Sequence, residues 1–160
     1  MHFDFERKQI GFSLIEIIIA VAVLGILAVL AVSGFSSFKA SGELFRAADT
    51  IVGALNNARS QTLASRDDSQ YGVFFDQNQN QIVFFAGNYY NASSPTNEIT
   101  ELPTQIEISS LSLTNATTAI AFARLSGDPS ATGTVVLRIK GNTLQTKTIQ
   151  INDSGTAEIK

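Results

Sequence analysis

One carboxylate stands out among the residues of this chain that could take part in chemistry. Glu16 is the only ionisable residue in the twenty-one residues from Phe12 to Val32. A charge at the centre of a membrane helix costs roughly 2.5–3.5 kcal/mol, and less near the helix end, so an acid in such a segment indicates a function by default. The plainer alternative is a charge that lies at the membrane interface by chance.

The residue types on which most enzymes depend are scarce. The chain has no cysteine, which excludes a disulfide framework, a thiol nucleophile, a cysteine-ligated metal and an acyl anchor on cysteine. His2 is the only histidine, so a Ser-His-Asp site and a multi-histidine zinc site have no candidates. We therefore expect no enzyme activity, no cofactor and no metal.

Two acidic motifs resemble sites but are better explained as loops. Asp67 and Asp68 form a carboxylate pair, but no neighbour in the sequence would perturb them, so we expect solvated loop charges. The segment "DQNQN", from Asp76, begins like a calcium-binding loop. Gln81 and Gly87 stand where that loop needs glycine and glutamate, so calcium is not expected there.

The length and charge of the chain suit one modest domain with an accessory segment. It has 160 residues and a formal charge of -3, which provides no general basic surface for nucleic acid. As a helix rising about 1.5 Å per residue, the apolar run would roughly cross the ~30 Å hydrocarbon core of a membrane. Arg7 and Lys8 precede this run and only Lys39 follows it closely, which favours an N-terminus on the cytoplasmic side.

An amphipathic helix is expected to follow the apolar run. Gly34 and Gly42 each lower helix stability by up to about 1 kcal/mol relative to alanine, which predicts a bend or an unwound section. Beyond them, apolar or small residues recur at alternating spacings of four and three, which marks one helical face. These residues are Leu44, Ala48, Ile51, Leu55, Ala58 and Thr62. This face should pack against a globular head.

From Tyr71 onward the pattern is typical of short β-strands. Seven β-branched and aromatic runs are separated by breaks rich in Asn, Gly and Ser. They read "YGVFF", "QIVFFA", "TQIEISSLSL", "AIAF", "TVVLRI", "TKTIQI" and "AEI". "DQNQNQ" predicts a hairpin turn, and residues 87–103 form the longest irregular connection. The sequence thus predicts an α+β fold: a long N-terminal helix packed against a small antiparallel β head, in two sheets.

The N-terminal stretch "KQIGFSLIEIIIAVAVLGILAVLA" combines a basic start with Gly11, Phe12, Glu16 and a long apolar run. This combination resembles the leader of type IV prepilins and type II secretion pseudopilins. An ordinary secretory signal peptide, cut near Ala31-Val32-Ser33, would have a shorter apolar run and a more basic start. A plain signal anchor would explain the length of the run but not Glu16.

This resemblance implies a processing route. A prepilin peptidase would cut between Gly11 and Phe12 on the cytoplasmic side, and the new amino group of Phe12 would be N-methylated. A glycine before the cut lets the peptidase approach the backbone closely. In pilin families the acid at the position of Glu16 is thought to accept the N-terminal amine of a neighbouring subunit. Each of these charges is costly near a bilayer without a partner.

The end of the expected helix leads directly into the first strand: "LFRAADTIVGALNNARSQTLASRDD" is followed by "YGVFFD". This arrangement resembles the GspH/FimT group of minor pseudopilins. Arg59 and Arg66 stand at the group's two arginine positions, and Thr62 stands where many members have alanine. The stretches "AIAFARLSGDPSATGTVVLRI" and "KTIQINDSGTAEI" look like the closing strands of that group.

The resemblance implies a structural minor pilin or pseudopilin that is assembled into a type IV pilus or a type II secretion filament. Its partners would be other pilins or pseudopilins, contacted through the N-terminal helix, the prepilin peptidase, an inner-membrane assembly platform and the lipid bilayer. The expected location is the cytoplasmic (inner) membrane, crossed once with the head outside, and then the filament. The expected divisions are a cleaved leader (1–11), a transmembrane and filament-core helix (12–38), its amphipathic half (39–68) and a β-rich head (69–160).

Two alternatives differ from this expectation in function. The first is a competence-type minor pilin that binds DNA through a basic C-terminal segment. Here the chain ends in "NDSGTAEIK", so DNA is disfavoured. Three strand residues could still gather as a basic edge, although such residues are usually solvated. They are Arg138, Lys140 and Lys147. The second alternative is a membrane-anchored domain with no filament role, which would keep an uncut N-terminus.

Overall fold

The computed structural model describes residues 11–160, except for the side chains of residues 30–37. His2, Arg7 and Lys8 therefore lie outside the described residues. The described part contains one long helix, α1 (Leu14–Leu63), two short 3₁₀ helices and eight strands. The chain divides into two compact units, residues 1–38 and 39–160.

The described part of the first unit is an apolar helix with exposed side chains. Every residue from 11 to 29 is exposed, and the large aliphatic side chains among them are 49% to 76% exposed. The predicted transmembrane segment, 12–38, includes residues 30–37, whose side chains the structure does not describe. Among the described residues, no helix is both long enough and apolar enough to cross a membrane.

Helix α1 continues through Gly34 and Gly42 without interruption, so the predicted unwound section is wrong. Each glycine costs only about 1 kcal/mol in a helix. For Gly42, tertiary packing readily offsets a penalty of that size, because one face of α1 is buried in the head from Ala40 onward.

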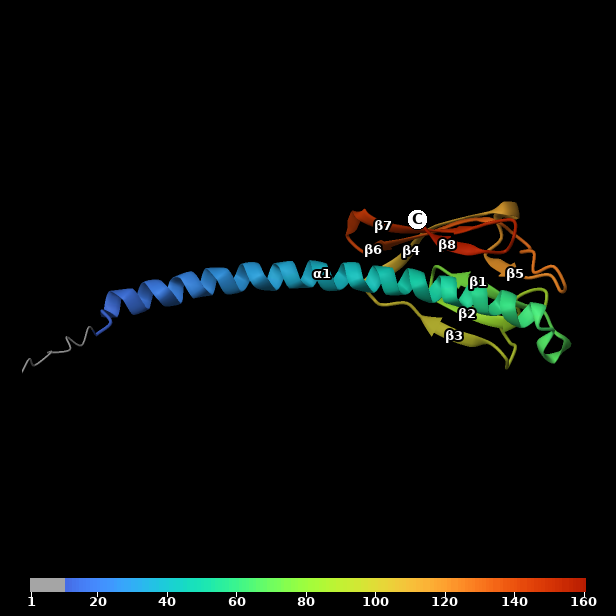
Figure 1. The fold of residues 1–160 in the computed structure, drawn as a ribbon, viewed down its shortest axis with the longest axis horizontal. Helices are drawn as coiled ribbons and strands as arrows, with labels where there is room; N and C mark the ends of the chain where they lie inside the picture. Colours follow the sequence, from blue (N-terminus) through green and yellow to red (C-terminus); the bar gives the residue numbers. More distant parts are fainter. Residues whose placement is uncertain (1–10) are drawn as a thin grey trace, which may run out of the picture. The chain divides into compact units, whose positions relative to one another are not determined.

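The second unit contains two antiparallel four-stranded sheets (Figure 1). The first sheet has the order β3-β2-β1-β5, with bounds β1 Tyr71–Asp76, β2 Gln81–Ala86, β3 Glu98–Glu101 and β5 Ala119–Ala121. The second has the order β4-β6-β7-β8, with bounds β4 Ile106–Leu113, β6 Gly133–Ile139, β7 Asn142–Ile151 and β8 Ala157–Ile159. The 3₁₀ helices η1 (Arg66–Asp68) and η2 (Thr114–Ala116) lie in the connections.

The predicted face of the helix forms the centre of the core. All six residues of that face are buried, with exposed fractions of 4% or less. Since side chains alternate along a strand, β1 adds Val73 and Phe75 to the same core, and β6 adds Val135 and Leu137. The predicted fold class is therefore confirmed: an α+β protein in which a long helix packs against two antiparallel sheets.

The connection 87–103 was expected to be irregular, but it contains strand β3. All four residues of β3 are exposed, and two of them are glutamates at its ends. Its place in the sheet is set by backbone pairing with β2, for example Val83 opposite Ile99. A short edge strand without buried side chains leaves no hydrophobic alternation in the sequence, which is why seven strands were expected and eight are present.

The predicted hairpin turn after β1 is confirmed. The carboxylate Oδ1 of Asp76 accepts hydrogen bonds from the backbone amides of Asn78 and Gln79, each at 3.0 Å. This carboxylate therefore stabilises its own turn. The described residues contain no group of three or more His, Asp or Glu side chains placed to hold a metal ion.

Candidate functional site: the N-terminal acid and the end of the helix

The structure brings Phe12 and Glu16 to the same side of the N-terminal helix. Both line a hollow of about 360 Å³, together with Ile17, Ala20 and Val21. Phe12 is 80% exposed, and Gly11 before it is also exposed. Phe12 precedes the first residue of α1, Leu14, so its place beside Glu16 is given by the shared hollow.

Glu16 also lies in the first turn of α1. The carbonyl of Ser13 accepts hydrogen bonds from the amides of Glu16 at 3.0 Å and Ile17 at 3.2 Å, so the helix begins immediately before the acid. The unpaired amides of a first turn favour a negative charge. The position therefore places the acid where the helix dipole favours a negative charge.

A second polar cluster joins the end of α1 to strand β1. The Thr62 hydroxyl donates to the carbonyl of Ala58 at 2.9 Å and accepts from the amide of Tyr71 at 2.9 Å. Thr62 is fully buried. The hydroxyl therefore satisfies the first amide of β1, a role that the helical pattern of the sequence did not reveal.

The phenol of Tyr71 continues this cluster. Its hydroxyl lies 3.0 Å from Oδ2 of Asp67 and 3.3 Å from the carbonyl of Arg66. Burial raises the pKa of Tyr71, and the hydrogen bond and negative charge of Asp67 raise it further. Asp67 is exposed, as expected for a loop charge, but it has a specific partner that the sequence did not identify.

Asp68 is likewise exposed and paired. Its carboxylate forms an ion pair with Arg124, whose guanidinium also donates to the Asp68 carbonyl at 3.0 Å. This contact links the end of the helix to the turn after β5, fifty-six residues later in the chain. The sequence does not predict this pairing, because neither residue lies in a recognisable motif.

The two arginines that match the GspH/FimT pattern differ in surroundings. Arg59 is half-buried, and its Nε donates to the carbonyl of Gly127 at 3.2 Å. Gly155 lies against the same carbonyl with φ +76°, and a Cβ on it would approach that oxygen to 2.3 Å. Arg59 therefore ties α1 to the turn at Gly127, against which Gly155 packs closely. Arg66, in contrast, is 62% exposed and contacts Asp67 at 3.6 Å.

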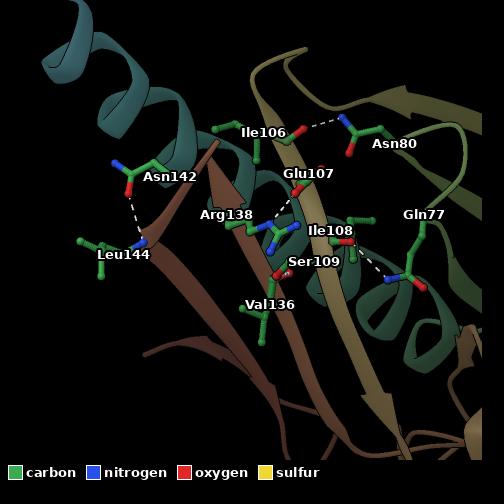
Figure 2. A network of polar contacts seen from close by, with 10 residues as sticks. All are labelled: Gln77, Asn80, Ile106, Glu107, Ile108, Ser109, Val136, Arg138, Asn142 and Leu144. Atoms are coloured by element: carbon green, nitrogen blue, oxygen red, sulfur yellow. Dashed lines mark hydrogen bonds and ion pairs between the residues drawn. The ribbon is translucent and has the colours of Figure 1, made fainter. Parts of the chain in front are cut away.

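The basic edge expected from Arg138, Lys140 and Lys147 is partly neutralised. Arg138 forms an ion pair with Glu107, which lies opposite it on β4 (Figure 2). The Lys147 ammonium lies 6.0 Å from the centre of the Phe45 ring. Arg138 therefore offers less free charge to a phosphate backbone than the sequence indicates.

Comparison with known proteins gives a motif match and fold matches. Residues 7–32 match the prokaryotic N-terminal methylation motif. No curated protein sequence matches the chain.

Two solved structures share the fold. The type IV minor pilin FimU of Pseudomonas aeruginosa is 14% identical, with a TM-score of 0.57 over 74% of this chain and 89% of that one. The minor pseudopilin EpsH of the type 2 secretion system of Vibrio cholerae is 16% identical, with a TM-score of 0.53 over 74% of this chain and 96% of that one. Residues 7–32 thus carry the methylation motif, and the described fold is that of a minor pilin and a minor pseudopilin, in agreement with the resemblance that the sequence indicates.

Proposed function

We propose that the chain is a non-enzymatic structural subunit, a minor pilin or pseudopilin that is assembled into a type IV pilus or a type II secretion filament. The observation that carries this proposal is the placement of Phe12 and Glu16 around one hollow, at the start of a helix whose aliphatic side chains are exposed. Exposed apolar surface of this extent needs a covering, which other helices of the same kind provide in a filament.

In this proposal the N-terminus is the part of the chain that is processed and that pairs with a neighbouring subunit. A prepilin peptidase cuts after Gly11, the amine of Phe12 is methylated, and the carboxylate of Glu16 accepts the amine of a neighbouring subunit. A methylated amine keeps its positive charge at neutral pH, so the pair remains one of opposite charges. Within an apolar filament core, such a pair is favoured because either charge alone would be buried without a partner.

Before assembly, the subunit resides in the cytoplasmic membrane. The support for this location is the apolar run from Phe12 to Val32 and the methylation motif that includes it. The head, which begins after the apolar helix, lies outside, and the inner-membrane assembly platform extracts the subunit into the filament.

Intact-mass spectrometry of the membrane-extracted protein tests the processing step. The expected mature chain begins at Phe12 and is heavier by one methyl group. A chain that begins near Gly34, as a secretory signal cut would produce, contradicts the proposal. An uncut chain also contradicts it and supports the membrane-anchored domain without a filament role.

Substitution of Glu16 tests the assembly step. Glu16→Gln keeps the size of the side chain and removes its charge, so we expect a processed, methylated subunit that no longer co-purifies with sheared filaments. Asp49→Asn is the matched control, since Asp49 is an exposed acid on the same helix. Normal incorporation of the Glu16→Gln variant would show that the carboxylate is not needed for assembly.

A further inference from the structure

The outer face of the first sheet carries a second, aromatic cluster. Phe85 is buried there, opposite Gly72 on β1, where a Cβ would approach the Phe85 ring to 2.5 Å. Tyr90, from the connection after β2, stacks on Phe74 with ring centres 4.0 Å apart and planes 5° apart. It also meets Phe85 edge to face at 5.7 Å. The connection is therefore folded over the sheet and held by aromatic packing.

A hollow of about 320 Å³ lies beside this cluster. Its lining consists of aromatic rings, hydroxyl and amide side chains and two alanines, and none of the lining residues is charged. Tyr89, at its rim, is 73% exposed. Within the described residues, the Tyr89 ring makes no aromatic contact, and the side chains of Asn88 and Thr118 make no hydrogen bond. The hollow thus offers the exposed ring of Tyr89 together with polar side chains that have no hydrogen-bond partner in the described part of the chain.

Hydrogen bonds hold two other wall residues of the hollow in place. The Ser130 hydroxyl accepts a hydrogen bond from the amide of Ala121 at 3.0 Å, and the Thr117 hydroxyl donates to the carbonyl of Ala119 at 3.2 Å. Both hydroxyls are thereby fixed against strand β5. A site that is already ordered loses little conformational entropy on binding.

The composition of the lining restricts the ligand. Without a charged group, the hollow has nothing to pair with a phosphate, a carboxylate or an ammonium. Phenol, amide and hydroxyl groups each donate and accept, which matches ligands with many hydroxyls. Aromatic faces are electron-rich and pack well on the C–H face of a pyranose ring. The volume lies near the lower end of the ~300–1,000 Å³ usual for small-molecule sites.

From this arrangement we propose that the hollow beside Tyr89 and Tyr90 binds a neutral saccharide. An extended proline-rich peptide also seeks aromatic surfaces, but it needs a groove and presents mainly carbonyl acceptors. The small size of the hollow and its mixed donors and acceptors favour the saccharide. This proposal concerns the head alone and does not depend on filament assembly.

Saturation-transfer NMR of the full chain tests the proposal. The protein is held in micelles of lauryldimethylamine oxide, a detergent without sugar, and is titrated separately with maltotriose, cellotriose and tri-N-acetylchitotriose. We expect transfer to the ring C–H protons of at least one trisaccharide. Transfer to none of them overturns the proposal, and so does stronger binding of a proline decamer that displaces the sugar.

Variants locate the binding. Tyr89→Ala removes an exposed ring, so the fold should remain, and we expect an affinity loss of about tenfold. Tyr89→Phe keeps the ring and should retain most of the affinity. Leu144→Ala, at a residue that is 93% exposed and outside the hollow, is the matched control and should bind like the parent. Equal affinity in Tyr89→Ala and the parent overturns the assignment, whatever the parent binds.

Discussion

The side-chain amide of Asn80 donates a hydrogen bond to the carbonyl oxygen of Ile106, 2.7 Å away, and this bond joins the two sheets (Figure 2). Asn80 ends the turn after β1 with φ 54°, a conformation that asparagine tolerates better than most residues. The side-chain amide of Gln77 likewise donates a hydrogen bond to the carbonyl of Ile108 at 3.2 Å. Two amides of one turn thus bind carbonyls of β4, an edge strand of the other sheet.

Asn80→Asp should destabilise the head. Aspartate tolerates the same backbone conformation but cannot donate to Ile106, and its negative oxygen would face a carbonyl. We expect a loss of about 1–3 kcal/mol in the free energy of unfolding, measured by urea denaturation. Asn78→Asp, in the same turn but exposed, is the control and should change stability little. Equal losses in the two variants would show that the inter-sheet bond is not the cause.

Thr62→Val should be destabilising although the shapes are similar. Valine cannot accept from the Tyr71 amide, which would be left buried without a partner. The expected loss is about 1–3 kcal/mol in the free energy of unfolding. Thr50→Val is the control, because Thr50 is exposed and bonds only to Arg46 within its own helix. A stability change in Thr62→Val no larger than in Thr50→Val would contradict the assigned role.

The raised pKa of Tyr71 should make stability depend on pH in the alkaline range. The folded state holds the phenol proton more tightly than the unfolded state, whose pKa is near 10.0. The contribution is therefore fully present below that pH and is lost as the pH rises through the folded-state pKa. Chemical denaturation across this range should show a smaller alkaline decline in Tyr71→Phe than in the parent. Tyr89→Phe, at an exposed tyrosine, should follow the parent, and identical declines in all three proteins would refute the prediction.

Arg59→Lys should weaken the contact between α1 and the turn at Gly127. Lysine keeps the charge but lacks the guanidinium Nε that donates to this carbonyl. We expect a loss of about 1–2 kcal/mol in the free energy of unfolding. The control, Arg66→Lys, changes an exposed arginine and should fall within about 0.5 kcal/mol of the parent. The opposite ranking of the two variants would mean that Arg66, not Arg59, secures the end of the helix.

A gel-shift titration of duplex DNA with the full chain in uncharged detergent tests the DNA alternative. We expect no retarded band at moderate salt, because the chain is acidic overall and Arg138 is paired with Glu107. Binding that weakens steeply as salt rises would instead indicate phosphate contacts. In that case Lys140→Glu, at an exposed residue of the candidate basic edge, should abolish it.

Patterns local to the chain predicted much of this architecture. The apolar face from Leu44 to Thr62 followed from a helical period, and the strand around Val73 and Phe75 followed from β-branched and aromatic residues. Strand β3 was not predicted, because its four side chains are exposed and only its backbone pairs with the sheet. Neither the division of the strands between two sheets nor the contact between Asn80 and β4 has a local signature.

The sequence by itself determined the N-terminal motif around Gly11, Phe12 and Glu16, because that signal consists of residue types at fixed spacings along one segment. The tertiary structure alone decided the partners of Thr62 and Arg59. Their bonds join residues that are nine and sixty-eight positions apart. Such contacts depend on how whole elements pack, since a hydrogen bond requires atoms within about 3 Å in a defined direction, and spacing along the chain does not specify that geometry.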